Sequence, residues 1–199
     1  MAQRLPGGPS FDDLYRQIQA LPEGMTGEIL EPGVLRTMSR PGGPHRVAAH
    51  RVRRALEGSD LAEGGTGFWF EVEAEIRFPE GLLAVPDLAA WRVPEPPTFV
   101  DENPITVLPD FCCEVLSPNT IRDDRRLKLP LFARSGVGWI WLVDPGLRLV
   151  EVYRSEGGRP ALVVTAKDDD ALELPPFEGD VDVGRWWKGP PPSTTRPAR

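Results

Sequence analysis

The stretch FCCEVLSPNTIRDDRRLKLPLFARSGVGWIWLVDP, residues 111–145, decides the fold. It begins with an apolar segment typical of a buried strand, continues into a charged helix and ends in a second apolar strand. Glu114 is the one carboxylate in the first strand. An unpaired carboxylate in a protein core is strongly unfavourable, so Glu114 needs a cation or strong hydrogen-bond donors beside it.

The segments around this stretch add further strands and two more helices. Ser10 is the predicted N-cap of a first helix that ends at Pro22, and Gly58 ends a second helix. The expected elements are, in order, a helix at 10–22, a strand pair at 27–38, a helix at 45–58, an alternating strand at 67–78, an apolar strand at 81–93, a proline-rich loop at 94–109, the strand–helix–strand stretch at 111–145 and closing strands to 187. This order predicts an α/β (α+β) domain with a central mixed β-sheet flanked by helices, and it has too few helices for a doubly wound fold.

The length and the composition predict one globular domain. Of the 199 residues, 40% are hydrophobic and 27% charged, and we expect a domain at 11–187 between a disordered N-terminus (1–10) and a disordered Pro-rich tail (188–199). No apolar run reaches the roughly 20 residues that a membrane span needs. The first ten residues lack an apolar signal core, which predicts a cytoplasmic protein.

Charge and cysteine usage narrow the classes further. The net charge of −7 argues against a protein that simply coats nucleic acid, but it leaves room for an enzyme that touches nucleic acid locally. Cys112 and Cys113 are neighbours on a strand, so their side chains point to opposite faces and cannot form a disulfide with each other. We interpret them as small core residues in a reducing compartment.

Three charged residues stand where the pattern predicts burial or a strand end. Asp87 is the one acid in an apolar strand, Glu114 lies in the next apolar strand, and Lys128 follows Asp124 by one helical turn. Two carboxylates on adjacent strands beside a lysine could hold a hard divalent cation, for which Mg²⁺ or Mn²⁺ is better suited than zinc. The alternative is that each acid reaches solvent at a strand end or pairs with an arginine.

The segments that carry these residues resemble the Uma-two family. The shared pattern comprises VPDLAAW with Asp87, then CEVLSP with Glu114, then an Asp four residues before a Lys (Asp124 and Lys128), and finally GVGWIWLVDP. More weakly, Glu28 in GEILEPGVL falls at the family's N-terminal acid. The family is a branch, typically bacterial, of the restriction-endonuclease-like PD-(D/E)XK phosphodiesterases.

The resemblance implies a metal-dependent endonuclease that acts on nucleic acid, DNA in particular, and that forms a homodimer. Asp87 and Glu114 would ligate Mg²⁺ or Mn²⁺, with the backbone carbonyl of Val115 as a further ligand. Lys128 would orient or activate the attacking water, or stabilise the phosphate charge. Glu28 would support a second metal or orient the lysine.

Several residues around this set have two readings. His45 is either a phosphate contact or supporting group, or a structural residue at a helix start. Asp124 is either a partner of Lys128 or a solvated acid. Thr120 and Asp123 fit a capping box, and Pro130 should kink the helix that follows.

The remaining candidates have structural readings. Asp144 suits a turn, Trp186 and Trp187 suit docking of the C-terminal segment or an oligomer contact, and the basic run Arg51–Arg54 suits a solvated helix face. A second hypothesis for the whole chain is a catalytically idle binding or assembly module on a nuclease fold. It rests on the net acidity and on the lack of a recognisable DNA-reading domain.

Overall fold

The computed structural model describes residues 8–39 and 43–187. Most of the expected disordered ends lie outside these described residues. The first helix, α1 (Phe11–Gln19), begins where the sequence predicts. The Asp13 backbone N–H donates to Ser10 Oγ at 3.1 Å, and the Ser10 backbone N–H donates to the Asp13 carboxylate at 3.0 Å. This reciprocal pair satisfies two of the N–H groups that a helix start leaves without partners.

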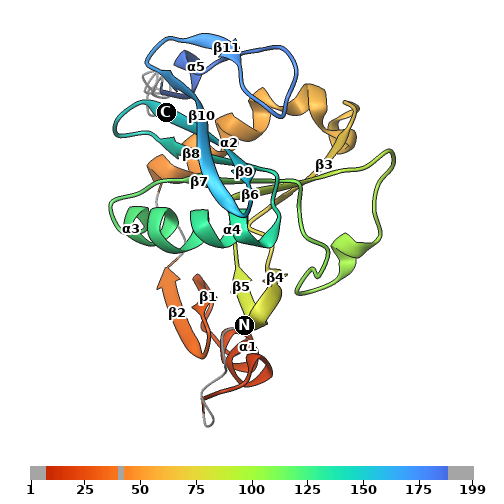
Figure 1. Cartoon of the computed structure of the whole chain (residues 1–199), viewed down its shortest axis with the longest axis vertical. Coiled ribbons are helices and arrows are strands. Elements are labelled where there is room, and N and C mark those ends of the chain that lie inside the picture. The colour runs from red at the N-terminus through yellow and green to blue at the C-terminus, as the bar shows by residue number, and fades with distance from the viewer. Residues whose placement is uncertain (1–7, 40–42, 188–199) are drawn as a thin grey trace, which may run out of the picture.

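A six-stranded mixed sheet forms the upper part of the molecule (Figure 1). Its strand order is β10-β9-β8-β7-β6-β3, with β7 and β8 parallel and the other neighbours antiparallel. The strands are β3 (Phe68–Val72), β6 (Leu88–Arg92), β7 (Phe111–Val115), β8 (Trp139–Asp144), β9 (Leu149–Glu156) and β10 (Arg159–Lys167). The parallel pair is formed by the two apolar strands of the stretch 111–145, so that stretch supplies the centre of the sheet.

A second, four-stranded sheet lies below the first, with α1 beneath it (Figure 1). Its strand order is β2-β1-β5-β4, and its strands are β1 (Met25–Glu31), β2 (Val34–Ser39), β4 (Ile76–Phe78) and β5 (Leu82–Ala84). Gly27 lets α1 approach β1 closely, because a Cβ at this position would lie 2.7 Å from Ile18 Cγ1. Near the C-terminus, β11 (Ala171–Glu173) and β12 (Asp180–Asp182) form a separate pair.

The second sheet corrects two expectations from the sequence. The segment 67–78 is two strands in different sheets, because the chain turns at Glu73, which has a left-handed φ of 51°. The segment 81–93 is likewise divided into β5 and β6, which belong to the lower and upper sheets. In 67–78 the alternation of apolar residues continues across the break, and in 81–93 the apolar run does, so the apolar pattern alone does not reveal that the chain changes sheets.

Helices cover both faces of the six-stranded sheet. Helix α4 (Leu129–Ser135) packs on one face with Phe132, which is fully buried among residues of β7 and β8. Helix α2 (Gly43–Ala55) packs on the other face, together with α5 (Gly184–Trp187). Short 3₁₀ turns occur at Glu57–Ser59, Leu61–Glu63, Pro79–Gly81 and Phe99–Asp101. The fold is therefore the mixed sheet flanked by helices that the sequence predicts.

Two further expectations concern the cysteines and membranes. Cys112 and Cys113 are free, fully buried and on opposite faces of β7, as their adjacency predicts. No helix among residues 8–39 and 43–187 is long and apolar enough to cross a membrane.

Candidate functional site

Asp87 and Glu114 come together because β6 and β7 run antiparallel. Leu88 is paired with Cys113, so the same register places Asp87, just before β6, opposite Glu114 in β7. Directly opposite residues of an antiparallel pair have side chains on the same face. Glu114 therefore shares the sheet face of Cys112, which packs in the core beneath α4, and Asp87 lies at the adjoining end of β6, so both carboxylates line one cleft.

Lys128 lies at the centre of a buried cluster of carboxylates. Its Nζ atom is 2.9 Å from Glu28 Oε1, 3.1 Å from each carboxylate oxygen of Glu114 and 3.7 Å from Asp124 Oδ1. Of the two Glu114 oxygens, Oε2 accepts the hydrogen bond in good geometry. All four side chains are at most 6% exposed. Asp124 is thus the partner of Lys128 and not a solvated acid.

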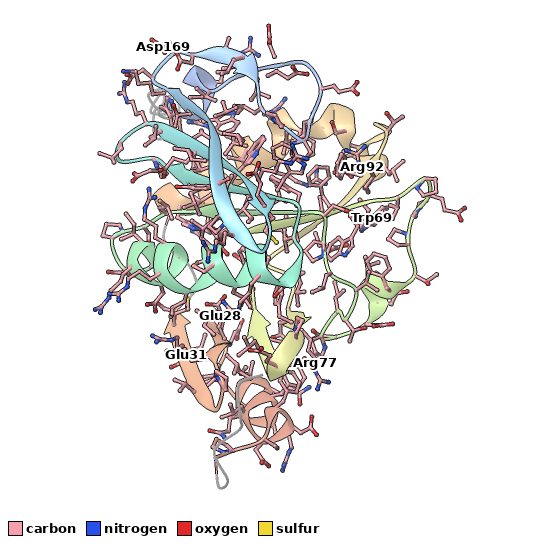
Figure 2. The ribbon with its side chains drawn as sticks, in the orientation of Figure 1. Glu28, Glu31, Trp69, Arg77, Arg92 and Asp169 are labelled. Carbon is pink, nitrogen blue, oxygen red and sulfur yellow. The ribbon has the colours of Figure 1, made fainter. Side chains whose placement is uncertain are left out.

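Glu28 reaches the cluster from the second sheet. Its Oε1 atom also accepts a hydrogen bond of 2.8 Å from the Val85 backbone N–H, in the segment between β5 and Asp87. Its Oε2 atom is buried and has no hydrogen-bond partner in the described part of the chain. Figure 2 shows Glu28 just below the helix that follows β7, whereas Glu31 lies at the far end of the same strand. Glu28 therefore joins the hairpin β1–β2 to the catalytic candidates of the upper sheet.

Lys128 is delivered by a π-helical turn. The helix after β7 starts as α3 (Ile121–Asp123), widens into a π-turn at Asp124–Lys128 and continues as α4. Within this turn the Leu129 N–H donates to the Asp124 carbonyl, five residues back. Pro130 cannot donate a backbone hydrogen bond, and its ring crowds the carbonyl four residues before it. The expected kink is thus absorbed as a wider turn, and π-turns of this kind are frequent at functional sites.

The start of this helix differs in detail from the predicted capping box. The helix does begin after Thr120, but neither Thr120 nor Asp123 makes a side-chain capping bond. The Thr120 hydroxyl instead contacts the Ser117 hydroxyl at 3.0 Å. The Asp123 carboxylate accepts a hydrogen bond of 3.0 Å from Arg36 of β2, because the lower sheet brings an arginine beside it.

Asp87 is held by two donors on one of its oxygens. Oδ2 accepts a hydrogen bond of 2.6 Å from the Val115 backbone N–H and lies 3.0 Å from His45 Nε2. His45 thereby contacts a candidate catalytic residue directly, although its Nδ1 atom is buried without a partner in the described chain. These two contacts fix the orientation of the carboxylate, which is 12% exposed.

The electrostatics of the cluster follow from its burial. Burial raises the pKa of Glu114 well above its usual value, against the opposing effect of the Lys128 charge. Burial likewise raises the pKa of Asp124, to about 6. Burial by itself lowers the pKa of Lys128, but the nearby carboxylates of Glu114 and Glu28 outweigh it, and the pKa is raised well above the usual value. The Lys128 ammonium therefore stays charged, while the Glu114 and Asp124 carboxyl groups hold protons more readily than they would in water.

The same residues border a cleft of about 130 Å³ between the two sheets. Six carboxylates, one ammonium and one imidazole take part in its lining, so its charge is strongly negative. The lining residues are Ile18, Met25, Thr26, Glu28, Met38, His45, Glu73, Glu75, Val85, Asp87, Glu114, Thr120, Asp124 and Lys128. A cleft with this charge attracts cations and repels an anion that is not accompanied by a cation.

Glu73 and Glu75 face the cleft, although the alternation of residues 67–78 would place both on the polar side of a single strand. Glu75 Oε2 accepts a hydrogen bond of 2.7 Å from the Tyr15 hydroxyl of α1. The Glu73 backbone N–H donates to the Asp87 carbonyl at 3.4 Å. Their position follows from the break between the two sheets at Glu73. The alternation of apolar residues continues through that break, so the sequence pattern gives no sign of it.

The other residues singled out in the sequence have structural places. The Asp144 side chain accepts a hydrogen bond of 3.0 Å from the Leu147 N–H in the turn after β8, as its turn role predicts. Trp186 is 3% exposed and packs on the upper core, which confirms the docking interpretation. The basic run is less solvated than expected, because Arg51 donates to the Trp186 carbonyl and Arg53 pairs with the buried Asp60.

Comparison with known proteins agrees with this architecture. A crystal structure of a "putative nuclease belonging to DUF820" from Anabaena variabilis matches with a TM-score of 0.67 and 19% sequence identity, covering 90% of this chain and 97% of that one. At this identity the likeness shows the fold. The search of curated proteins gave no match. The family model Uma2, described as "Putative restriction endonuclease", matches residues 12–183, and the chain therefore belongs to the Uma2 family.

Proposed function

We propose that the protein is a Mg²⁺-dependent endonuclease that hydrolyses phosphodiester bonds of nucleic acid, specifically DNA, with Mn²⁺ as an alternative metal. The observation that carries this proposal is the meeting of Asp87, Glu114 and Lys128 in one cleft, from two strands and the helix that follows them. Membership of a family described as restriction endonucleases supports it. Restriction-endonuclease-like families generally use divalent metals.

The donor set fits Mg²⁺. No group of three or more His, Cys, Asp or Glu side chains within residues 8–39 and 43–187 has the arrangement of a preformed metal cage. Mg²⁺ needs no such cage, since it commonly binds through one or two carboxylates and completes its shell with waters and substrate phosphate oxygens. Asp87 and Glu114 supply the two carboxylates, and the Val115 carbonyl is the further oxygen that we assign to the site.

The chain's own residues would divide the work as follows. Bound metal would supply Lewis-acid stabilisation of the phosphoryl charge and a nucleophile at neutral pH. His45 and the Val115 N–H hold Asp87 in a fixed orientation, because both contact the same carboxylate oxygen. The Lys128 ammonium would donate hydrogen bonds to the phosphate as its negative charge grows. Glu28 would orient that ammonium, since Oε1 lies 2.9 Å from Nζ.

One observation favours the second candidate function, a catalytically idle binding or assembly module. The Lys128 ammonium is already surrounded by three carboxylates, so it is neutralised without a substrate. In an idle module this buried ion-pair network would serve the fold alone. Calorimetric titration with Mg²⁺ separates the two candidates, because the idle module predicts no binding that depends on Asp87 and Glu114.

The decisive experiment measures cleavage of labelled DNA with Mg²⁺, with Mn²⁺ and with a chelator. We expect cleavage with either metal, none with the chelator, and a loss of at least about 100-fold in the Asp87→Asn and Glu114→Gln variants. Glu178→Gln is the matched control, because Glu178 is an exposed carboxylate outside the cleft. Full activity in Asp87→Asn, together with unchanged Mg²⁺ binding, would refute the assignment.

We also propose that the enzyme is cytoplasmic and forms a homodimer. Each copy contributes one domain, at residues 11–187. The family resemblance motivates the dimer. Sedimentation at micromolar concentration tests it: a monomer at all concentrations would count against it.

A further inference from the structure

The catalytic candidates lie deeper than a surface groove. Glu114 and Asp124 are each 2% exposed and Lys128 is 5% exposed. The four-stranded sheet is the element that encloses them, because Glu28 on β1 reaches Lys128 and Arg36 on β2 reaches the start of α3. A phosphodiester that reacts here must therefore enter the space between the two sheets.

The wall contributed by the hairpin β1–β2 is apolar near the catalytic cluster. Thr26 is paired with Met38, two residues along β1 from Glu28, so these side chains share the sheet face that carries Glu28. Met25 and Ile18 add further apolar surface to the same cleft. Unbranched methionine side chains adapt to flat or irregular partners, which suits contact with a base of any identity.

The wall contributed by the connection between β3 and β4 is acidic. Glu73 and Glu75 both line the cleft, and the second of them is held in place by the Tyr15 hydroxyl. Carboxylates at this position repel a phosphate backbone that approaches from their side. One nucleic-acid strand can therefore pack against the apolar wall, whereas the acidic wall repels the phosphate backbone of a second nucleic-acid strand beside it.

From this geometry we propose that the substrate strand enters the cleft unpaired, as single-stranded nucleic acid or an unpaired end, and that Met38 contacts the base next to the scissile phosphate. The inference rests on the proposed nuclease function. Glu114, Asp124 and Lys128 line the cleft between the two sheets and are at most 5% exposed, so a base pair beside the scissile phosphate would also have to fit between the sheets. A paired strand would have to be unpaired and unstacked before it reached Glu114, which selects for substrates that are already open.

The experiment compares initial cleavage rates with Mg²⁺ on three DNAs that carry one test sequence: a single strand, a duplex with an unpaired overhang, and a relaxed, covalently closed circular duplex without ends or loops. We expect the single strand and the overhang to be cut at least about tenfold faster than the closed duplex. Equal or faster cleavage of the closed duplex overturns this inference and leaves the nuclease function standing. No cleavage of any of the three overturns the nuclease function and this inference with it.

Variants of the apolar wall test the contact itself. Met38→Ala should raise KM for the single strand severalfold with kcat little changed, and Met38→Leu should restore the wild-type value. Val34→Ala is the matched control, because Val34 is an apolar residue of the same strand that is 44% exposed and outside the cleft. An unchanged KM in Met38→Ala, with the fold intact by circular dichroism, overturns the assignment of Met38.

Discussion

Replacing Lys128 by methionine tests the buried cluster most directly. Methionine keeps a long unbranched side chain but removes the ammonium that lies 2.9 Å from Glu28 and 3.1 Å from Glu114. Removing one partner of a buried ion pair costs about 3–5 kcal/mol, because the other charge is left buried and uncompensated. We therefore expect the free energy of unfolding of Lys128→Met to fall by about this amount near pH 8.

The loss of stability in Lys128→Met should depend on pH, because the carboxyl groups around Lys128 titrate. Without the ammonium, the folded-state pKa values of the Glu114 and Asp124 carboxyls, which burial already raises, rise further above their unfolded values near about 4. The folded state then binds more protons than the unfolded state, so stability falls as pH rises from about 4 through the folded pKa values. The deficit relative to wild type should accordingly be smaller at pH 5 than at pH 8.

Urea unfolding at pH 5 and pH 8, followed by the fluorescence of buried tryptophans such as Trp141, measures both effects. Lys167→Met is the matched control, since Lys167 is an exposed lysine of β10. Adding Glu28→Gln to Lys128→Met should recover part of the loss, because it removes one uncompensated charge. A deficit no larger than that of Lys167→Met, or one that is equal at both pH values, would refute this account of the cluster.

Two further predictions concern single residues. Asp124 has a pKa raised to about 6, so its protonation stabilises the folded state below about pH 4, and this contribution is lost as pH rises to about 6. In urea unfolding between pH 4 and pH 6, the free energy of unfolding of Asp124→Asn should therefore decline less steeply than that of wild type, by at most about 1.4 kcal/mol per pH unit. Parallel curves of stability against pH would contradict this. Ser10→Ala should lower the free energy of unfolding by about 1 kcal/mol through loss of the α1 cap, with cleavage activity unchanged; a Tm equal to that of wild type would show that the cap contributes nothing.

Much of the local structure was predictable because its causes are close in sequence. Ser10 and Asp13 cap α1 within three residues of each other, and the apolar runs of β7 and β8 are buried where they occur. The site residues Asp87, Glu114 and Lys128 could be proposed because charged side chains interrupt apolar patterns. The register of β6 against β7 then places the two acids opposite each other.

The breaks between the two sheets were not predictable from periodicity. Residues 67–78 keep a period of two across Glu73, although the chain leaves one sheet there and enters another. The local pattern reports which side chains are apolar, but it does not report against which neighbouring strand they pack. For the same reason the alternation places Glu73 and Glu75 on the polar side of a single strand, while the second sheet turns them toward the cleft.

The sequence by itself determined the central strands β7 and β8, the helix that follows β7 and the identities of the charged residues around it. Only the tertiary structure decided that Glu28, one hundred positions before Lys128, lies 2.9 Å from its ammonium, and that a π-turn accommodates Pro130. The energy of an ion pair depends on the distance between the charges and on their removal from water. Neither quantity is fixed until the two sheets close around the cluster.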